Sequence, residues 1–267
     1  MRSLFSDQFR LMILIVACAL LWSLESFIPL NGYAKDRFRR AVPNVALTVL
    51  LVATNLLLSF GSAQLATLVQ AKQFGLFFTI RLSSWMTLIL GIVALDLFAY
   101  FAHSLLHKSW LGWQFHRVHH SDKDVNVTTA FRQHPGETVW RMLWQVLAVA
   151  IFGLSLEVVA VYLTMSALNA QLEHANIKVN DSLDRWLRMI LVTPNMHKVH
   201  HSREQIETDT NYSNIFSIWD RIFGTYTQSV DFKQLRYGLD GFDDPKKQTV
   251  TALLTLPFVN EMSRRSS

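Results

Sequence analysis

Cysteine and charged residues are both scarce in this sequence. Cys18 is the one cysteine among 267 residues, so an intramolecular disulfide and a cluster of thiolate metal ligands are both excluded. Charged residues make up 17% of the chain and hydrophobic residues 51%, and the mean hydropathy is +0.21. This apolar content is high for a soluble protein. The composition therefore predicts a membrane protein.

Motifs that bind common redox cofactors are also missing. The sequence has no Gly-x-Gly-x-x-Gly after a strand pattern, no cysteine set for an iron-sulfur cluster and no haem attachment motif. The formal net charge is +5, but the basic residues lie in short clusters beside apolar segments, which favours anionic lipid head groups over nucleic acid as partners. One such cluster is Lys35, Arg37, Arg39 and Arg40.

Three apolar segments are long enough to cross a bilayer, which takes about 20 residues. They cover residues 11–30, 42–69 and 84–106. A cleavable signal peptide is not expected, because Glu25 and Pro29 stand where a small-residue cleavage site would lie. The first segment is therefore interpreted as a transmembrane helix.

The charges of the connecting loops predict how these helices are oriented. Residues 31–41 hold four Lys or Arg and should stay in the cytoplasm, whereas residues 71–83 hold only Lys72 and Arg81. The N-terminus is then expected outside, and the third segment should end on the cytoplasmic side.

The rest of the chain alternates between polar and apolar stretches. Residues 110–137 are polar and should form a cap outside the hydrocarbon. Residues 138–174 are apolar over more than one span, and Gly153 followed by Ser155 supplies a helix breaker and an N-cap. This pattern predicts a helical hairpin that enters from the cytoplasm and returns there. The short apolar pieces from residue 176 onwards predict a cytoplasmic or interfacial cap.

Eight of the ten histidines fall into three groups with helical spacing. On a helix, residues at i and i+4 share a face, so two imidazoles at that spacing can reach a common metal. One group has this spacing, and the other two add a position at i+3. The groups are His103 and His107, then His116, His119 and His120, then His197, His200 and His201.

These histidines predict a site for two metals, because one metal rarely takes more than six ligands. The expected fold is an all-α integral-membrane bundle of about three spans plus the hairpin, with a cytoplasmic histidine-rich helical cap that holds the dinuclear site. Three regions are expected: transmembrane anchor helices over residues 1–95, a catalytic domain over 96–230, and a C-terminal cap with a basic tail over 231–267. The basic residues of the last region include Lys246, Lys247, Arg264 and Arg265.

Two other functional classes use many imidazoles. A membrane zinc hydrolase would share the ligands, but Ser104 stands where zinc proteases with a helical histidine pair place a glutamate base. A metal transporter or haem-binding membrane protein would hold its histidines at mid-membrane depth or pair them across helices. The histidines here gather at one side, which disfavours that class. Ligand type by itself would suit zinc nearly as well as iron.

In order and spacing, these motifs resemble those of the fatty acid hydroxylase and sterol desaturase superfamily of integral-membrane di-iron enzymes. The resemblance covers Asp96 to Tyr226. The matching stretches are DLFAYFAHSLLH, WQFHRVHHSDKDVN, AFRQHPGE, EHANI, TPNMHKVHHS and NYSNIFSIWDRIFGTY.

The resemblance implies an enzyme with two iron ions that uses O2 as co-substrate to hydroxylate or desaturate a lipid such as a fatty acyl chain or a sterol. Because the chain has no motif for a reductant, a separate electron-transfer protein is also implied. The ligands implied are His103, His107, His116, His119, His120, His174, His197, His200 and His201.

Further residues have expected roles near this site. His134 is expected either to bind metal or to hydrogen-bond to a ligand. Ala170 and Gln171 stand where some relatives carry another histidine, which leaves one coordination position for water. Asp96 lies seven residues before His103, on the same helical face, where an ionisable group is costly unless paired. It is expected to support catalysis by accepting an N–H from a ligand histidine or by holding an arginine, or else to make a hydrogen bond that packs helices.

The stretch from Trp219 to Tyr226 matches the closing motif of the superfamily. A structural role is expected for it, because Ile215, Ile218 and Ile222 have the spacing of an amphipathic helix at the membrane surface.

Overall fold

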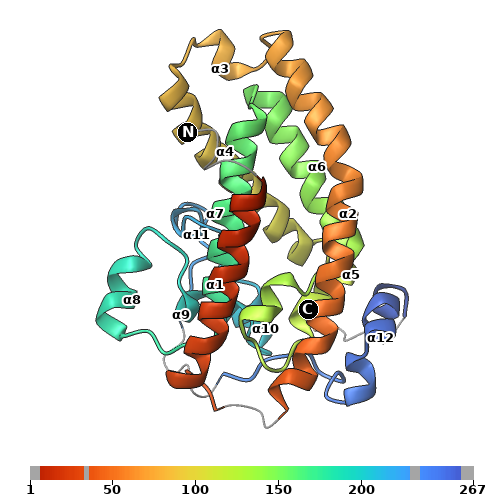
Figure 1. The fold of residues 1–267 in the computed structure, drawn as a ribbon. Coiled ribbons are helices and arrows are strands. Elements are labelled where there is room, and N and C mark those ends of the chain that lie inside the picture. The colour runs from red at the N-terminus through yellow and green to blue at the C-terminus, as the bar shows by residue number, and fades with distance from the viewer. Residues whose placement is uncertain (1–6, 33–35, 229–234, 260–267) are drawn as a thin grey trace.

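The computed structural model describes residues 7–32, 36–228 and 235–259 (Figure 1). Within these ranges the chain is helical and forms no strand, only three isolated bridges between single residues. The expected all-α fold is confirmed. Lys35, Arg264 and Arg265 lie outside the described residues.

Three long helices are apolar enough to cross a membrane, as the apolar segments predict. They are α1 (Asp7–Phe27), α2 (Arg37–Ala71), which the short α3 (Leu76–Thr79) prolongs, and α4 (Ser84–Lys108). Within α1 the one buried residue is Glu25, while apolar side chains such as Leu20 are 59% exposed. Such a surface is stable in lipid and would be costly in water.

The expected hairpin is confirmed as α6 (Pro135–Phe152) and α7 (Leu156–His174). Gly153 ends α6 in the left-handed conformation, with φ 74°, and the Ser155 hydroxyl accepts from the amide of Val158 to begin α7. Figure 1 shows the hairpin rising beside α2 and α4, with its turn next to α3.

The shorter helices gather at the end of the bundle away from α3 (Figure 1). They form the cap, and the chain enters it from α4 and from α7. Its elements are α5 (Trp110–His120), η1 (Val127–Phe131), α8 (Asp181–Leu187), α9 (Pro194–His200), α10 (Gln205–Thr208), α11 (Ile218–Ile222), η2 (Pro245–Gln248), α12 (Val250–Thr255) and η3 (Leu256–Phe258).

The helix expected around Trp219 is shorter than the apolar spacing predicts. It is α11, and Ile215 lies outside it and is buried. The reason is Asp220, whose carboxylate accepts from the amides of Tyr212 (2.7 Å) and Ser213 (3.0 Å) and folds the preceding segment back on itself. This part of the chain packs into the cap and has the expected structural role.

A buried carboxylate joins α1 to the cap. Glu25 Oε1 accepts from the amides of Val127 (2.7 Å) and Asn176 (2.8 Å), and Oε2 pairs with Arg37 (2.9 Å). These bonds satisfy a charge that would be costly inside a membrane protein if it were unpaired.

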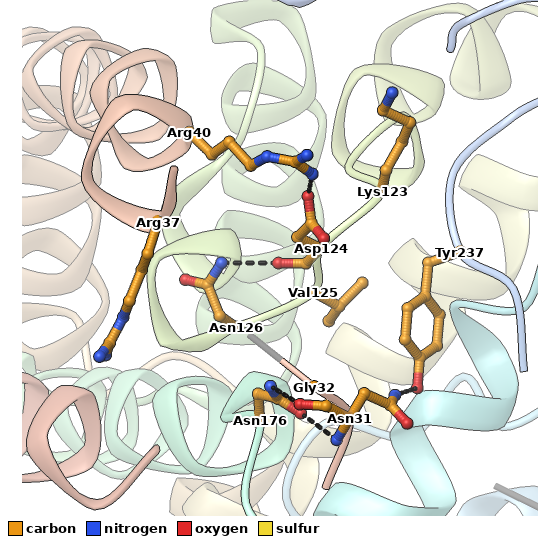
Figure 2. Close-up of a pocket in the computed structure, with 10 residues that line it drawn as sticks. All are labelled: Asn31, Gly32, Arg37, Arg40, Lys123, Asp124, Val125, Asn126, Asn176 and Tyr237. Carbon is orange, nitrogen blue, oxygen red and sulfur yellow. Dashed lines mark hydrogen bonds and ion pairs between the residues drawn. The ribbon is translucent and has the colours of Figure 1, made fainter. Parts of the chain in front are cut away.

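Figure 2 shows the surface beside this joint, a small pocket between the α1–α2 connection and the cap. Asn31 and Asn176 exchange two hydrogen bonds of 3.0 Å between backbone and side chain. The side-chain amide of Asn31 also donates to the hydroxyl of Tyr237 (3.1 Å). Arg40 forms an ion pair with Asp124. The charged side chains of Arg40 and Asp124 are thus paired with each other. This ion pair holds the cap against α2.

Candidate metal centre

Nine histidines are buried together where four helices meet in the cap. They are the nine that the family resemblance implies as ligands. α4 carries His103 and His107, α5 carries His116, His119 and His120, α7 ends at His174, and α9 carries His197 and His200, with His201 directly after it.

Local capping fixes where two of these helices begin. Ser109 ends α4 and also caps α5, because its hydroxyl accepts from the amide of Gly112 (3.1 Å). Thr193 caps α9 by accepting from the amide of Met196 (3.3 Å), with Pro194 at the first helical position. Each helix therefore begins within one or two turns of its first histidine, and the following histidines project from one end.

The ring nitrogens form two groups, and within each group one nitrogen per residue lies within 4.8 Å of all the others. The division cuts across the sequence motifs, since helices α5 and α9 each supply both groups. The first group is His103, His107, His116, His120 and His200, and the second group is His119, His174, His197 and His201.

In the second group, lone pairs converge on a common point. His174 Nδ1 lies 2.7 Å from the carbonyl oxygen of Ala170, which can only accept, so Nδ1 donates and Nε2 keeps its lone pair. This Nε2 lies 3.1 Å from Nε2 of His119 and 3.0 Å from Nε2 of both His197 and His201. One lone pair cannot accept from three donors. Two nitrogens about 2.1 Å from one ion, at right angles, stand about 3.0 Å apart, so the spacing fits a shared ion.

The first group shows the same pattern. His103 Nδ1 donates to the carbonyl of Tyr212 (2.8 Å), and its Nε2 lies 3.0 Å from Nε2 of His116. His200 Nδ1 donates to the carbonyl of Thr210 (2.7 Å), while its buried Nε2 has no hydrogen-bond partner among the described residues. A buried nitrogen of this kind is costly unless something else binds it.

Two carboxylates orient further histidines of the first group. His116 Nδ1 lies 3.0 Å from Glu137, and His107 Nδ1 lies 3.2 Å from Asp209. Glu137 also accepts from Nε of Arg141 (2.8 Å). Carboxylate partners of this kind fix the ring tautomer and make the other nitrogen a better ligand. Sequence reasoning missed both acids. Glu137 ends the quoted AFRQHPGE stretch, which is a usable signal, but nothing in the sequence singles out Asp209.

Burial keeps the cap histidines neutral. Burial, together with neighbouring imidazoles such as His116, lowers the pKa of His200 to about 3. Burial also lowers the pKa of His119, His120, His197 and His201. At pH 7 these rings are uncharged, which is the form that binds a metal.

The donor set fits two metal ions. Each group offers four or five imidazoles, which is within the coordination capacity of one ion, and the rings are buried and neutral. Imidazole suits iron, zinc, copper and nickel, so the ligand type permits iron.

His134 takes neither of the expected roles. It lies outside both groups and caps α6, because its Nδ1 accepts from the amide of Gly136 (3.0 Å). Its Nε2 lies 3.2 Å from the carbonyl of Leu254, and its ring stacks on Phe115. Among the described residues it contacts no ligand candidate. Pro135 begins α6, so the residue before it stands at the capping position.

Asp96 also differs from its expected role in catalysis. Its carboxylate accepts from the amides of Ile215 and Phe216, both at 3.0 Å, and from the indole of Trp219 at 2.9 Å. No histidine or arginine is bonded to it within the described chain. These hydrogen bonds fit the alternative expectation of packing, since Asp96 anchors the segment before α11 to α4.

Sequence reasoning also missed Lys198, which lies inside the third histidine motif and is fully buried. Its ammonium donates to the carbonyls of Val125 (3.1 Å) and His174. Burial lowers the pKa of Lys198 to about 7, against the opposing effect of Glu25. Lys198 thus ties α9 to the end of α7, where His174 lies.

Comparison with known proteins gives a match over the same part of the chain. A sequence profile described as fatty acid hydroxylase matches residues 88–225, just over half of the chain. This region contains all nine histidines of the two groups. No solved structure shows significant similarity.

Several curated proteins are similar in sequence. Alkylglycerol monooxygenase from Homo sapiens is 34% identical over 158 residues, which cover 58% of this chain and 33% of that protein. The Xenopus tropicalis protein of the same name is 32% identical over 158 residues, with the same coverage. Ornithine lipid hydroxylase from Rhizobium tropici is 31% identical over 138 residues, 52% of this chain and 41% of that protein. The aligned part of this chain thus spans about a third of the first two relatives.

Proposed function

Because the chain belongs to the fatty acid hydroxylase family, we propose that it is an O2-dependent membrane di-iron oxygenase that hydroxylates a lipid. The observation that carries this proposal is the pair of buried imidazole groups at the cap end of apolar helices. The names of the relatives, a monooxygenase of alkylglycerols and a hydroxylase of ornithine lipids, support a lipid substrate.

We assign one iron to each histidine group. In the first group, His103, His107 and His200 each have a hydrogen-bond partner at Nδ1. These partners are the carbonyl of Tyr212, the carboxylate of Asp209 and the carbonyl of Thr210, in that order. Each bond turns the Nε2 atom of its ring towards the proposed position of the iron. In the second group, the Ala170 carbonyl does the same for His174. Iron bound in these groups would supply the reductive activation of O2.

The balanced reaction is RH + O2 + 2 e⁻ + 2 H⁺ → ROH + H2O. The two electrons come from a separate electron-transfer protein, because the sequence contains no motif for a nicotinamide, flavin, haem or iron-sulfur cofactor. The cap faces the cytoplasm in this proposal, so the donor docks there. Removal of a second hydrogen instead of oxygen transfer would give an alkene, with both oxygen atoms leaving as water.

The three regions of the chain have different roles in this proposal. Residues 1–95 anchor the protein in the bilayer, residues 96–230 hold the catalytic groups, and residues 231–267 complete the cap. In the described part of the last region, Leu256 accepts a hydrogen bond from the buried Arg117 of α5 (2.5 Å).

The test combines metal analysis with isotope labelling. The purified full chain should contain about two irons, and reduction without air followed by O2 should change its absorption spectrum. Incubation with membrane lipids, a reductant and ¹⁸O2 should give a lipid alcohol that carries one ¹⁸O. Two redox-silent zinc ions after expression with added iron would favour a hydrolase. A preparation that binds no metal would refute the proposal.

A further inference from the structure

A cavity of about 1000 Å³ lies among the membrane helices and ends beside the histidines. Its walls come mainly from α2, α4, α6 and α7. Along α7 it extends from Leu156 to Ala170, fourteen helical steps of 1.5 Å each, or about 21 Å. That is about two thirds of the hydrocarbon thickness of a bilayer, so an acyl or alkyl chain fits lengthwise.

Two alanines that line one end of the cavity lie close in sequence to the histidine groups. Ala102 lines it and directly precedes His103 of the first group. Ala170 lines it one turn before His174 of the second group, and its carbonyl holds the His174 ring. This end of the cavity is therefore the end nearer the metal centre.

The wall at the metal end carries a cation with unused hydrogen-bond donors. Arg141 lines the cavity one turn after Thr138, and its side chain is 29% exposed there. Only its Nε is engaged, by Glu137, which also holds His116. No other described residue accepts a hydrogen bond from its two Nη groups, which leaves four of the five guanidinium N–H donors available.

The other charged residues of the wall give the cavity an electrostatic direction. Glu157 lies at the start of α7, at the end away from the metals. Arg10 lines the α1 side, but it already forms an ion pair with Asp7. Arg141 is likewise ion-paired, with Glu137, so both cations of the wall have a carboxylate partner, whereas Glu157 has no ion-pair partner among the described residues and makes the opposite end negative. An anionic group can therefore accept from the remaining Nη donors of Arg141 and is repelled by Glu157.

We propose that this cavity binds a lipid with an anionic oxygen group, a carboxylate or a phosphate, in a head-first orientation. The anionic group is held by the fork of Arg141, which matches both oxyanions in geometry. The chain then runs along α7 towards Leu156, past apolar side chains such as Phe60 and Leu163. Resting on the proposed oxygenase function, this orientation places the oxidised carbon within a few bonds of the head group.

The orientation is tested by photo-crosslinking of the full chain in nanodiscs, which requires neither iron nor O2. Two palmitate probes carry a diazirine, one next to the carboxylate and one at the methyl end. The head-labelled probe should modify the wall around Ala102 and Thr138, and the tail-labelled probe the wall around Phe60 and Leu156. The opposite pattern, or no modification in the cavity, would overturn the inference.

Variants test the anion site in the same assay. Arg141→Gln should weaken palmitate binding by about tenfold to a hundredfold, as expected for a lost hydrogen bond to a charged group. Hexadecanol, which has no charge, should bind both proteins equally, and this shows that Arg141→Gln is folded. Arg236→Gln is the matched control, because Arg236 is an exposed cation that pairs with Glu204 outside the cavity, and it should leave palmitate binding unchanged. Palmitate binding by Arg141→Gln as tight as that of Arg236→Gln would contradict the proposal.

Competition identifies the head group, and metal analysis separates this inference from the proposed function. Unlabelled palmitate and lysophosphatidate are titrated against the head-labelled probe, and the one that displaces it at lower concentration defines a carboxylate or a phosphate site. Displacement by neither would reject the anion site. Iron is measured on the same samples, so a chain that holds two irons and lacks the anion site refutes only the inference.

Discussion

At the scale of single residues, the chemistry depends on which ring nitrogen of each histidine carries the proton. Backbone carbonyls settle this for His103, His174 and His200. His116 has a carboxylate partner, Glu137, which is fully buried and shared with Arg141. A charged partner makes the imidazole a stronger ligand than a carbonyl does, so His116, like His107 with Asp209, should strengthen the binding of iron.

Glu137→Gln tests that contribution. Glutamine keeps the shape of the side chain and removes its charge, so the iron affinity of the first group should fall by about tenfold to a hundredfold. The measurement is the iron retained against increasing chelator. Glu157→Gln, the same substitution at the far end of the hairpin, is the control and should retain iron like the unmodified protein. Equal retention in both variants would show that Glu137 does not support a ligand.

His134 provides a second test, because it is a buried histidine with a structural role. His134→Ala removes the cap of α6, which should cost about 1 kcal/mol and lower the thermal midpoint while the iron content is kept. His174→Ala should instead lose the iron of the second group, since His174 lies at its centre. Iron analysis and a melting curve on each variant distinguish the two roles. Iron loss in His134→Ala would restore it as a ligand.

At the scale of helices, the turn of the hairpin depends on two glycines in contact. A Cβ on Gly153 would lie 2.4 Å from the carbonyl oxygen of Phe74, and a Cβ on Gly75 would lie 2.3 Å from the amide nitrogen of Gly153. Both residues have positive φ, which favours glycine. The connection between α2 and α3 can therefore press directly on the backbone of the hairpin turn.

Gly153→Ala should lower the thermal midpoint of the protein in detergent. The positive φ alone costs about 1–2 kcal/mol for alanine, and the contact with Phe74 adds to it. Gly61→Ala is the matched control, because Gly61 lies inside α2 with no atom within 4 Å of the added Cβ. That variant should gain roughly 0.5–1 kcal/mol. Equal midpoints for the two variants would show that the turn is not tightly packed.

The helices themselves were predictable from the sequence, and their mutual contacts were not. The spacing of His116, His119 and His120 predicts that they share a helical face, and they do. Which histidine joins which group depends on how α5 meets α7 and α9, so the sequence spacing did not reveal that His119 joins the second group while His116 and His120 join the first. Asp96 is a similar case, because its partners lie more than a hundred residues along the chain.

At the scale of the whole molecule, the apolar helices and the histidine cap define two ends. α3 and the hairpin turn lie at one end, and the cap lies at the other (Figure 1). The basic residues at the start of α2, Arg37, Arg39 and Arg40, lie at the cap end, where Arg40 pairs with Asp124. Basic loops stay in the cytoplasm, so the whole cap should face that side.

Labelling of single cysteines tests this orientation. In a Cys18→Ser background, Ser182→Cys places a thiol on the exposed surface of α8 in the cap, and Lys72→Cys places one at the opposite end. A membrane-impermeant maleimide should label Lys72→Cys in intact cells and Ser182→Cys only after permeabilisation. The reverse pattern would place the metal site outside the cell.

The joint made by Glu25 has a consequence for biosynthesis. Arg37 follows it by 12 residues, whereas its amide partners, Val127 and Asn176, follow by 102 and 151 residues. At about 5–20 residues per second, the ribosome adds Arg37 within about 1–2 s, and Val127 only after about 5–20 s. The ion pair can shield the carboxylate in the meantime. The first helix to be made is therefore fixed to the cap late, once nearly two thirds of the chain has been translated.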